Sequence, residues 1–331
     1  MARSLIVLPD DSARPILEAI ARAGRMLRIK MFVFSDRALL KAVVSAKRRG
    51  VHVQVMLNPI RRSGEQDNEG TRLALERAGI AVKDANPAFD LTHEKSMVVD
   101  DKTAYVKSLN WTTKNLTETR DYAVVTDHKR EVTEIVDCFE ADWHRDTFEA
   151  PSRTHLVWCP GPGRDRIVNF IDAAKRRLFV QNERFQDSVI IERLVRASRR
   201  GVKVHVMARP PHTLKRDKLV EGVGGLRILD DLGIKIHTLK HLRLHGKMIL
   251  ADHVAALVGS MNFAAGSLDG RRELAIVVRD ANVVDRLYKT AQHDWKRSHP
   301  LDLSDEGLMA DLEDRLEGNA GLLGIDATRT H

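Results

Sequence analysis

The chain repeats itself, and this constrains its fold more than any other feature of its 331 residues. Residues 19–59 read AIARAGRMLRIKMFVFSDRALLKAVVSAKRRGVHVQVMLNP, and residues 170–210 read FIDAAKRRLFVQNERFQDSVIIERLVRASRRGVKVHVMARP. The tetrapeptide Arg-Arg-Gly-Val stands at 48–51 in the first copy and at 199–202 in the second. A single long-period repeat of this kind predicts two similar halves of about 150 residues each.

Each half alternates apolar strands with amphipathic helices. In the first half we expect a strand at 29–34, a helix at 37–49 and a strand at 51–57, and in the second the equivalents at 178–181, 188–200 and 202–208. This alternation predicts an α/β fold. We expect two similar α/β sandwich repeats with mixed sheets, related by a pseudo-twofold axis, with the active site between them.

The expected boundaries follow the composition. The first repeat covers 1–149, a linker with three prolines covers 150–162, and the second repeat covers 163–300. An acidic C-terminal tail covers 301–331, and its first part could form a short helix.

The charge is unevenly distributed along the chain. The net charge is +8, but the segment from Asp302 onward carries eight acids and two bases, so the body before it carries +14. A basic body favours an anionic partner such as a phosphodiester, a nucleic acid or an anionic membrane surface, although a solvated basic surface has the same composition. Aromatic residues make up only 5% of the chain, which leaves little for base stacking.

Two cysteines, Cys138 and Cys159, imply no disulfide framework. The apolar run at 5–8 is too short for the core of a signal peptide, and no apolar stretch reaches the length of a membrane span. We expect a cytoplasmic protein, or one that is peripheral on the inner face of a membrane.

One spaced motif occurs in both halves. It consists of His93, Lys95, Asp100, Ser108 and Asn110, and again, 152 residues later, of His245, Lys247, Asp252, Ser260 and Asn262. A lone His-x-Lys carries no information, but two copies of a five-residue pattern in equivalent repeats are specific.

The motif also has a predictable geometry. Residues i and i+2 of an extended chain point to the same side, so the histidine and lysine of each copy share a face. The apolar segments 97–99 and 104–106 predict a hairpin with its turn at Asp100. Such a hairpin returns the serine and the asparagine to the side of the histidine.

At these residues the chain resembles the phospholipase D superfamily, whose signature is His-x-Lys, four residues, Asp, six residues, Gly-Ser-x-Asn. The likeness covers both repeats. Lys107 replaces the signature glycine in the first copy, whereas Gly259 keeps it in the second. The open position between His and Lys is filled by Glu94 and by Gly246.

The resemblance implies phosphodiester chemistry through a covalent phosphohistidine, with neither a metal nor another cofactor. It implies that His93 is the nucleophile and His245 the general acid, an assignment that the symmetry of the sequence leaves open. Lys95 and Lys247 are then expected to neutralise the non-bridging oxygens of the phosphate.

Further site positions come in pairs, one from each repeat. Asp121 and Glu273, each 28 residues after the histidine of its own repeat, are expected to orient the histidines. The remaining predicted pairs are Asn110 and Asn262 as donors to the phosphate, Ser108 and Ser260 as substrate-binding or supporting hydroxyls, and Asp100 and Asp252 as braces of the hairpin turns. Two basic loops at 58–64 and 209–218 are expected to form a rim that collects an anionic group, unless they are merely solvated.

The function expected from these residues is hydrolysis of a phospholipid at a membrane surface, or phosphatidyl transfer to an alcohol, as in the phosphatidylserine and cardiolipin synthases of the superfamily. The acceptor is water or an alcohol. One alternative is a metal-independent nuclease, which the charge of +14 suits. A second alternative is a non-catalytic module that binds anionic ligands, although both histidines and both lysines are retained. The sequence does not determine the oligomeric state.

Overall fold

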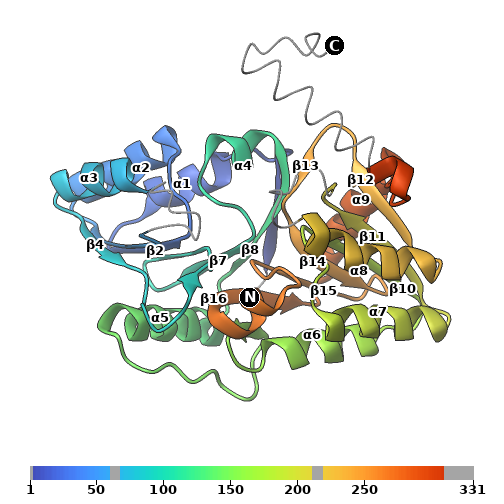
Figure 1. The fold of residues 1–331 in the computed structure, drawn as a ribbon. Coiled ribbons are helices and arrows are strands. Elements are labelled where there is room, and N and C mark those ends of the chain that lie inside the picture. The colour runs from blue at the N-terminus through green and yellow to red at the C-terminus, as the bar shows by residue number, and fades with distance from the viewer. Residues whose placement is uncertain (1–2, 60–67, 211–218, 309–331) are drawn as a thin grey trace, which may run out of the picture.

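The computed structural model describes residues 3–59, 68–210 and 219–308. These residues form two α/β repeats, each built on a mixed sheet, which confirms the predicted fold class (Figure 1). The basic loops of the sequence analysis, apart from residues 58–59 and 209–210, and the acidic tail after residue 308 lie outside the described residues.

The first repeat contains the sheet β1-β8-β7-β6-β2-β3-β4. The strands β2, β3 and β4 at one end of this sheet are parallel, and the others run antiparallel to their neighbours. The strands are β1 (Ser4–Leu8), β2 (Met26–Met31), β3 (His52–Leu57), β4 (Ala81–Asp84), β6 (Ser96–Val99), β7 (Thr103–Lys107) and β8 (Thr119–Thr126). The helices are α1 (Arg14–Arg22), α2 (Arg37–Arg48), α3 (Glu69–Arg77), α4 (Thr113–Thr117) and α5 (Lys129–His144).

The second repeat contains the equivalent sheet β17-β12-β11-β10-β14-β15-β16, with β9 paired to β16. Its strands are β9 (Leu156–Cys159), β10 (Arg177–Asn182), β11 (Lys203–Ala208), β12 (Lys235–Leu239), β14 (Lys247–Ala251), β15 (Ala255–Gly259), β16 (Arg271–Val278) and β17 (Ser298–Pro300). Its helices are α6 (Gly163–Asp172), α7 (Ser188–Arg199), α8 (Leu219–Asp231), α9 (Ala281–Lys296) and the π-helical turn η3 (Gly266–Gly270).

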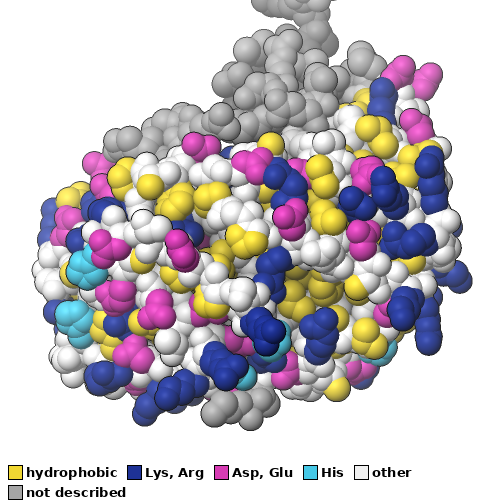
Figure 2. All heavy atoms as spheres, turned by 90° about the horizontal axis from the view of Figure 1, so that it is seen from below, with side chains coloured by type: hydrophobic (Ala, Val, Ile, Leu, Met, Phe, Trp, Pro, Cys, Tyr) yellow, Lys and Arg dark blue, Asp and Glu magenta, His cyan; other side chains and the backbone are white. Residues whose placement is uncertain are grey.

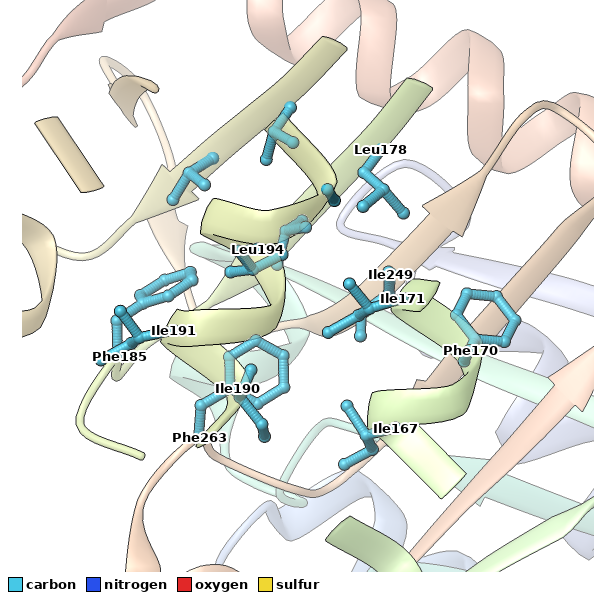
Figure 3. Packing of buried hydrophobic residues seen from close by; sticks show 14 of the residues in the cluster. Ile167, Phe170, Ile171, Leu178, Phe185, Ile190, Ile191, Leu194, Ile249 and Phe263 are labelled. Atoms are coloured by element: carbon cyan, nitrogen blue, oxygen red, sulfur yellow. The ribbon is translucent and has the colours of Figure 1, made fainter. Parts of the chain in front are cut away.

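The helices form where a capping residue precedes an apolar stripe. Asp36 and Asp187 accept hydrogen bonds from backbone N–H groups in the first turns of α2 and α7, which satisfies donors that the helix itself leaves free. The buried face of α7 presents Ile190 and Leu194 to the sheet, where they join a cluster that includes Ile249 (Figure 3). Truncating a fully buried leucine such as Leu194 to alanine typically costs about 2–5 kcal/mol.

The two sheets also pack against each other. A single buried cluster takes side chains from both sheets and from α5 and α9, among them Val106 and Tyr122 of the first repeat and Leu250, Val258 and Leu274 of the second. The repeats therefore share one hydrophobic core, which fixes their relative position.

Each repeat lends a two-residue strand to the sheet of the other. The strand β5 (Leu91–Thr92) of the first repeat pairs with β16, so that Thr92 lies opposite Arg272. The strand β13 (Arg243–Leu244) of the second repeat pairs with β8, so that Leu244 lies opposite Arg120. The next residue after each lent strand is one of the two motif histidines, which is thereby placed beside the other repeat.

Two buried ion pairs join the repeats in the same reciprocal way. The guanidinium of Arg120 lies 2.8 and 2.9 Å from the carboxylate oxygens of Asp294 on α9, and that of Arg272 lies 3.1 Å from both oxygens of Asp142 on α5. Removing one partner of such a pair leaves an uncompensated buried charge.

The predicted helices and most strands agree with the structure to within one residue at their ends. The strand expected at 29–34 is misplaced, because β2 covers Met26–Met31. After Met31 the chain leaves the sheet, and Phe34 forms an isolated bridge with Trp111 instead. The apolar run continues past the strand because this connecting segment is itself packed in the interior.

Candidate active site

His93 is held between the two repeats. Its Nδ1 atom lies 3.0 Å from Oε2 of Glu273 and 3.1 Å from the backbone oxygen of Ser260, both in the second repeat. Its backbone N–H donates to the oxygen of Arg272 at 2.9 Å, which continues the pairing of β5 with β16. A carboxylate can only accept a hydrogen bond, so a neutral His93 carries its proton on Nδ1 and leaves the lone pair of Nε2 available.

His245 is held in the mirrored arrangement. Its Nδ1 atom lies 2.8 Å and 3.1 Å from the two carboxylate oxygens of Asp121, which belongs to the first repeat. The backbone N–H of the following Gly246 donates to Arg120 at 2.7 Å. Each histidine is therefore oriented by the carboxylate of the other repeat. The sequence relates each acid only to the histidine of its own repeat, by a spacing of 28 residues.

The two orienting carboxylates are themselves fully buried and hydrogen bonded. Asp121 accepts from the hydroxyl of Ser108 at 2.5 Å, and Glu273 accepts from that of Ser260 at 2.5 Å. Both serine hydroxyls donate to the carboxylates that orient the histidines, which agrees with a role in holding those carboxylates in place. A direct contact with substrate remains a prediction.

The environments of the two carboxylates differ. Burial disfavours the charge of Asp121, but His245 and Lys247 hold its pKa below the ordinary value. Burial raises the pKa of Glu273, in spite of nearby Lys95 and the hydroxyls of Ser260 and Ser267.

The two motif lysines flank the histidines. Lys95 is buried, and its Nζ donates to the backbone oxygen of His93. Lys247 donates in the same way to the backbone oxygen of His245. Burial lowers the pKa of Lys95 to about 7. Because burial disfavours the charge of Lys95, an anion that binds beside it would stabilise its protonated form.

The asparagines of the motif are also buried. The Oδ1 atoms of Asn110 and Asn262 have no hydrogen-bond partner among the described residues. An unpaired polar atom in the interior is costly, and such atoms are concentrated at functional sites. Donation by these amides to a phosphate remains a prediction.

The aspartates of the hairpin turns lie away from the histidines. Asp100 has a positive φ of 55° and accepts from the backbone N–H groups of Gly24, Arg25 and Met26 at 2.7–3.0 Å. Asp252 does the same for the N–H groups of residues 175–177 at 2.7–2.8 Å. These contacts tie each turn to the start of the neighbouring strand.

Lys107, which replaces the signature glycine, is fully buried. Its Nζ lies 4.4 Å from the ring centre of Trp111 and has no hydrogen-bond partner within the described ranges. Burial, with a contribution from Lys95, lowers its pKa well below the ordinary value. At the equivalent Gly259 a side chain would collide with Ala275, so only the first repeat has room for a larger residue.

A buried group of charges lies behind the first histidine. Glu94, Cys138 and Asp142 place possible ligand atoms within 4.8 Å of one another. The space is taken by the ammonium of Lys30, which lies 2.9 Å from Glu94 and 2.7 Å from Asp142. The cation that these acids hold is therefore a side chain of the protein, and this group gives no reason to assign a metal.

The arrangement can carry out nucleophilic catalysis at an anionic centre. Burial and the charges of Lys95 and Lys247 lower the pKa of His93 well below its ordinary value, so its imidazole is neutral at physiological pH. A neutral imidazole can attack phosphorus, and a second imidazole held by a carboxylate can transfer protons.

Sequence reasoning missed several residues of this site. Thr119 and Asn115 donate to Asp121 at 2.6 and 3.2 Å, and Ser267 donates to Glu273. A further carboxylate, Glu183, lies 2.6 Å from the ammonium of Lys247. A position-by-position comparison of the repeats could have found it, because the first repeat has Phe32 at that place.

On the face of the molecule drawn in Figure 2, Lys and Arg side chains lie among Asp and Glu side chains and some hydrophobic ones. The positive charge is spread over this face and forms no single basic band there. Within residues 3–59, 68–210 and 219–308, no helix is both long enough and apolar enough to cross a bilayer.

Comparison with known proteins gives a consistent result. The family model described as "Cardiolipin synthase, PLD-like domain" matches residues 16–143 and again residues 167–295. Cardiolipin synthase A of Pectobacterium atrosepticum is 24% identical over 325 residues, and the match covers 82% of this chain and 64% of that protein. Cardiolipin synthase B of Salmonella typhi is 25% identical, with 82% of this chain and 75% of that protein covered. The chain therefore spans less than two thirds of the first of these relatives.

Two solved structures share the whole fold. The phosphatidylserine synthase of Haemophilus influenzae has a TM-score of 0.71 at 10% identity and covers 97% of this chain and 95% of its own. The polyphosphate kinase of Porphyromonas gingivalis has a TM-score of 0.71 at 15% identity and covers 97% of this chain and 53% of its own. At these identities the likeness concerns the fold alone.

Proposed function

Because this chain belongs to the phospholipase D-like family described as "Cardiolipin synthase, PLD-like domain", we propose that it cleaves or exchanges the phosphodiester bond of phospholipids through a covalent phosphohistidine. The observation that carries the proposal is the reciprocal pair of His93 with Glu273 and His245 with Asp121. Both pairs are flanked by a lysine, and together they supply a nucleophile, a proton donor and positive charge for a phosphate.

The proposed first step forms the covalent adduct. Nε2 of His93 attacks phosphorus, and the bond from phosphorus to the leaving oxygen breaks with its electron pair on oxygen. The protonated His245 gives that oxygen its proton. Lys95 and Lys247 offset the charge of the non-bridging oxygens, and Asn110 and Asn262 are proposed to donate hydrogen bonds to them.

The second step releases the phosphatidyl group. Water or an alcohol attacks phosphorus and gives its proton to the now neutral His245. The bond between phosphorus and Nε2 breaks, and its electron pair returns to His93. Water gives hydrolysis and an alcohol gives transfer, so a single site can support both reactions.

A phospholipid substrate is favoured by the cardiolipin synthases among the relatives. We propose that the protein acts at a membrane surface as a peripheral enzyme. A nuclease is the second candidate, and the +14 charge of the body favours it. A purely binding role accounts less well for two complete sets of motif residues.

The test is an assay of the pure protein on mixed phospholipids with glycerol as the acceptor, in the presence of a chelator. We expect phosphatidic acid or a phosphatidyl-alcohol, and no product from the His93→Ala variant. Single- and double-stranded DNA and RNA are offered in parallel. Cutting of nucleic acid without any lipid product would refute the lipid assignment and support the nuclease.

A further inference from the structure

Among the differences between the two halves of the candidate site, one changes the charge beside a histidine. In the paired strands Lys30 lies opposite Ser96, and Gln181 lies opposite Met248, so the two repeats superpose with Lys30 on Gln181. Two residues further on, the first repeat has Phe32 and the second has Glu183. Both follow the strand that leads into the site.

On the first side, an aromatic ring occupies this place. The ring centre of Phe32 lies 4.9 Å from that of His93, in an edge-to-face arrangement, and 5.1 Å from Nζ of Lys95. In the part of the chain that the structure describes, no carboxylate lies within ion-pair distance of Lys95. The surroundings of His93 are therefore apolar or positively charged, apart from Glu273 at its Nδ1 atom.

On the second side, the carboxylate of Glu183 occupies the position equivalent to Phe32. Oε2 of Glu183 lies 2.6 Å from Nζ of Lys247 and 3.9 Å from Nε2 of His245, and Arg209 lies 3.3 Å from its other oxygen. The side chain is largely buried. Burial opposes its ionisation, but Lys247, His245 and Arg209 hold its pKa well below the ordinary value. Glu183 is thus a fixed negative charge beside the free nitrogen of His245.

The charged groups around the two histidines therefore differ. Lys95, Lys247 and Arg271 all disfavour a proton on His93. His245 faces Asp121 from β8 and Glu183 from the end of β10, and the ammonium of Lys247 from β14 lies on Glu183. A carboxylate on each side of an imidazole stabilises its protonated form.

We propose that Glu183 is a positioning residue that makes the two histidines unequal: it stabilises protonated His245 as the acid and holds Lys247, while Phe32 keeps the His93 side free of acids. This inference rests on the proposed function. The symmetry that leaves the roles open in the sequence is broken at this pair of positions, where the charge beside the two histidines differs.

The test is the Glu183→Gln variant, which removes the charge and keeps the shape. Two substrates are compared over a range of pH: a phospholipid, whose leaving alcohol needs a proton, and a p-nitrophenyl phosphodiester, whose leaving group does not. With the phospholipid we expect kcat/KM to fall about tenfold or more and the alkaline limit of activity to move to lower pH. With the nitrophenyl ester, adduct formation should change less than about threefold.

Two further variants control for structure. Glu192→Gln makes the same change on the exposed face of α7 and should alter the turnover of neither substrate. Glu183→Asp keeps the charge on a shorter side chain and should return the alkaline limit of activity part of the way to its wild-type pH. This variant also tests the proposal if Glu183→Gln folds poorly. Equal losses on both substrates with an unchanged pH limit would show that Glu183 is only structural. A wild type that turns over neither phosphodiester would overturn the proposed function, and the role of Glu183 with it.

Discussion

Nδ1 of His93 lies 3.0 Å from Oε2 of Glu273, a residue 180 positions later in the chain and in the other repeat. The matching contact joins His245 to Asp121 at 2.8 Å across 124 positions. Both contacts follow from the exchanged strands β5 and β13, which carry each histidine to the edge of the opposite sheet. Each half of the site is thus assembled from both repeats.

This arrangement predicts the effect of neutralising either orienting acid. In Glu273→Gln or Asp121→Asn, an amide can face the imidazole with its N–H group and favour the wrong tautomer. We expect kcat to fall on the order of 10²–10⁴-fold while the fold is kept, because the geometry is nearly unchanged. The matched control is Asp285→Asn on the exposed face of α9. An activity within a factor of about two of wild type would contradict the orienting role.

The proposed roles of the histidines predict where phosphorus is found during turnover. His93→Ala should form no adduct with any substrate. His245→Ala should form the adduct from a substrate with a good leaving group and release it slowly, because water then lacks its base. The combined variant should lose little more activity than either single one, since the pair acts as a unit.

The adduct is detected as an acid-labile, base-stable phosphohistidine by mass spectrometry after quenching at high pH. Phosphorus on His245 in the His93→Ala variant would reverse the two roles. A kinetically competent wild type with no adduct in either variant would instead indicate direct attack by water.

Lys107 predicts a gain in stability. Its buried amine has no hydrogen-bond partner among the described residues, so Lys107→Met should raise the free energy of unfolding by about 1–3 kcal/mol. The pKa of Lys107 is lowered in the folded state, so between that lowered pKa and the ordinary value of 10.5 the unfolded chain binds a proton that the native protein does not. The cost of burying Lys107 therefore diminishes as the pH rises toward 10.5, and the advantage of Met shrinks with it.

Denaturant unfolding of both proteins at pH 7 and pH 10 measures this difference. Activity should stay close to that of wild type, because the side chain points into the core beside Trp111. An equal stability difference at the two pH values would mean that Lys107 is protonated in the native protein.

The buried ion pairs between the repeats predict unequal costs for equivalent substitutions. Asp294→Asn removes one of two carboxylates from Arg120, which also lies 2.9 Å from Asp10, whereas Asp142→Asn removes a carboxylate from both Arg272 and Lys30. We expect Asp142→Asn to destabilise by about 3–5 kcal/mol and the matched Asp294→Asn by less. Thermal unfolding of the two variants gives the comparison, and equal losses would show that Lys30 does not depend on Asp142.

Lys95 predicts a pH dependence of anion binding. Its pKa of about 7 in the free protein means that it loses its charge as the pH rises above 7, while a bound anion raises that pKa. The affinity for sulfate, which does not itself titrate in this range, should therefore fall by up to about tenfold per pH unit above pH 7. Calorimetry of wild type and of Lys95→Gln isolates the contribution, and identical slopes in the two proteins would contradict it.

The repeat made the fold predictable from the sequence. Two copies of the same strand and helix pattern specify two similar sheets, and the Asp caps of α2 and α7 locate the helix starts. The paired motif indicated which side chains to examine. What remained hidden was the exchange of β5 and β13, because a two-residue strand has no periodicity and its pairing depends on a partner more than 100 residues away.

The contact between Glu273 and His93 was hidden for the same reason. Spacing along the chain relates Glu273 to His245, and only the crossing of the lent strand assigns it to His93. Glu183 has no motif at all. A comparison of the repeats sets it against Phe32, and its distance of 3.9 Å from Nε2 of His245 then makes it a functional candidate.

The exchange of strands within a single chain also determines how the activity responds to dilution of the protein. A site built from two separate subunits comes apart when the protein is diluted, because its halves must find each other in solution. Here a covalent connection joins the halves, so each partner experiences a fixed effective concentration of the other. Specific activity should therefore be constant down to the lowest protein concentrations that an assay can follow.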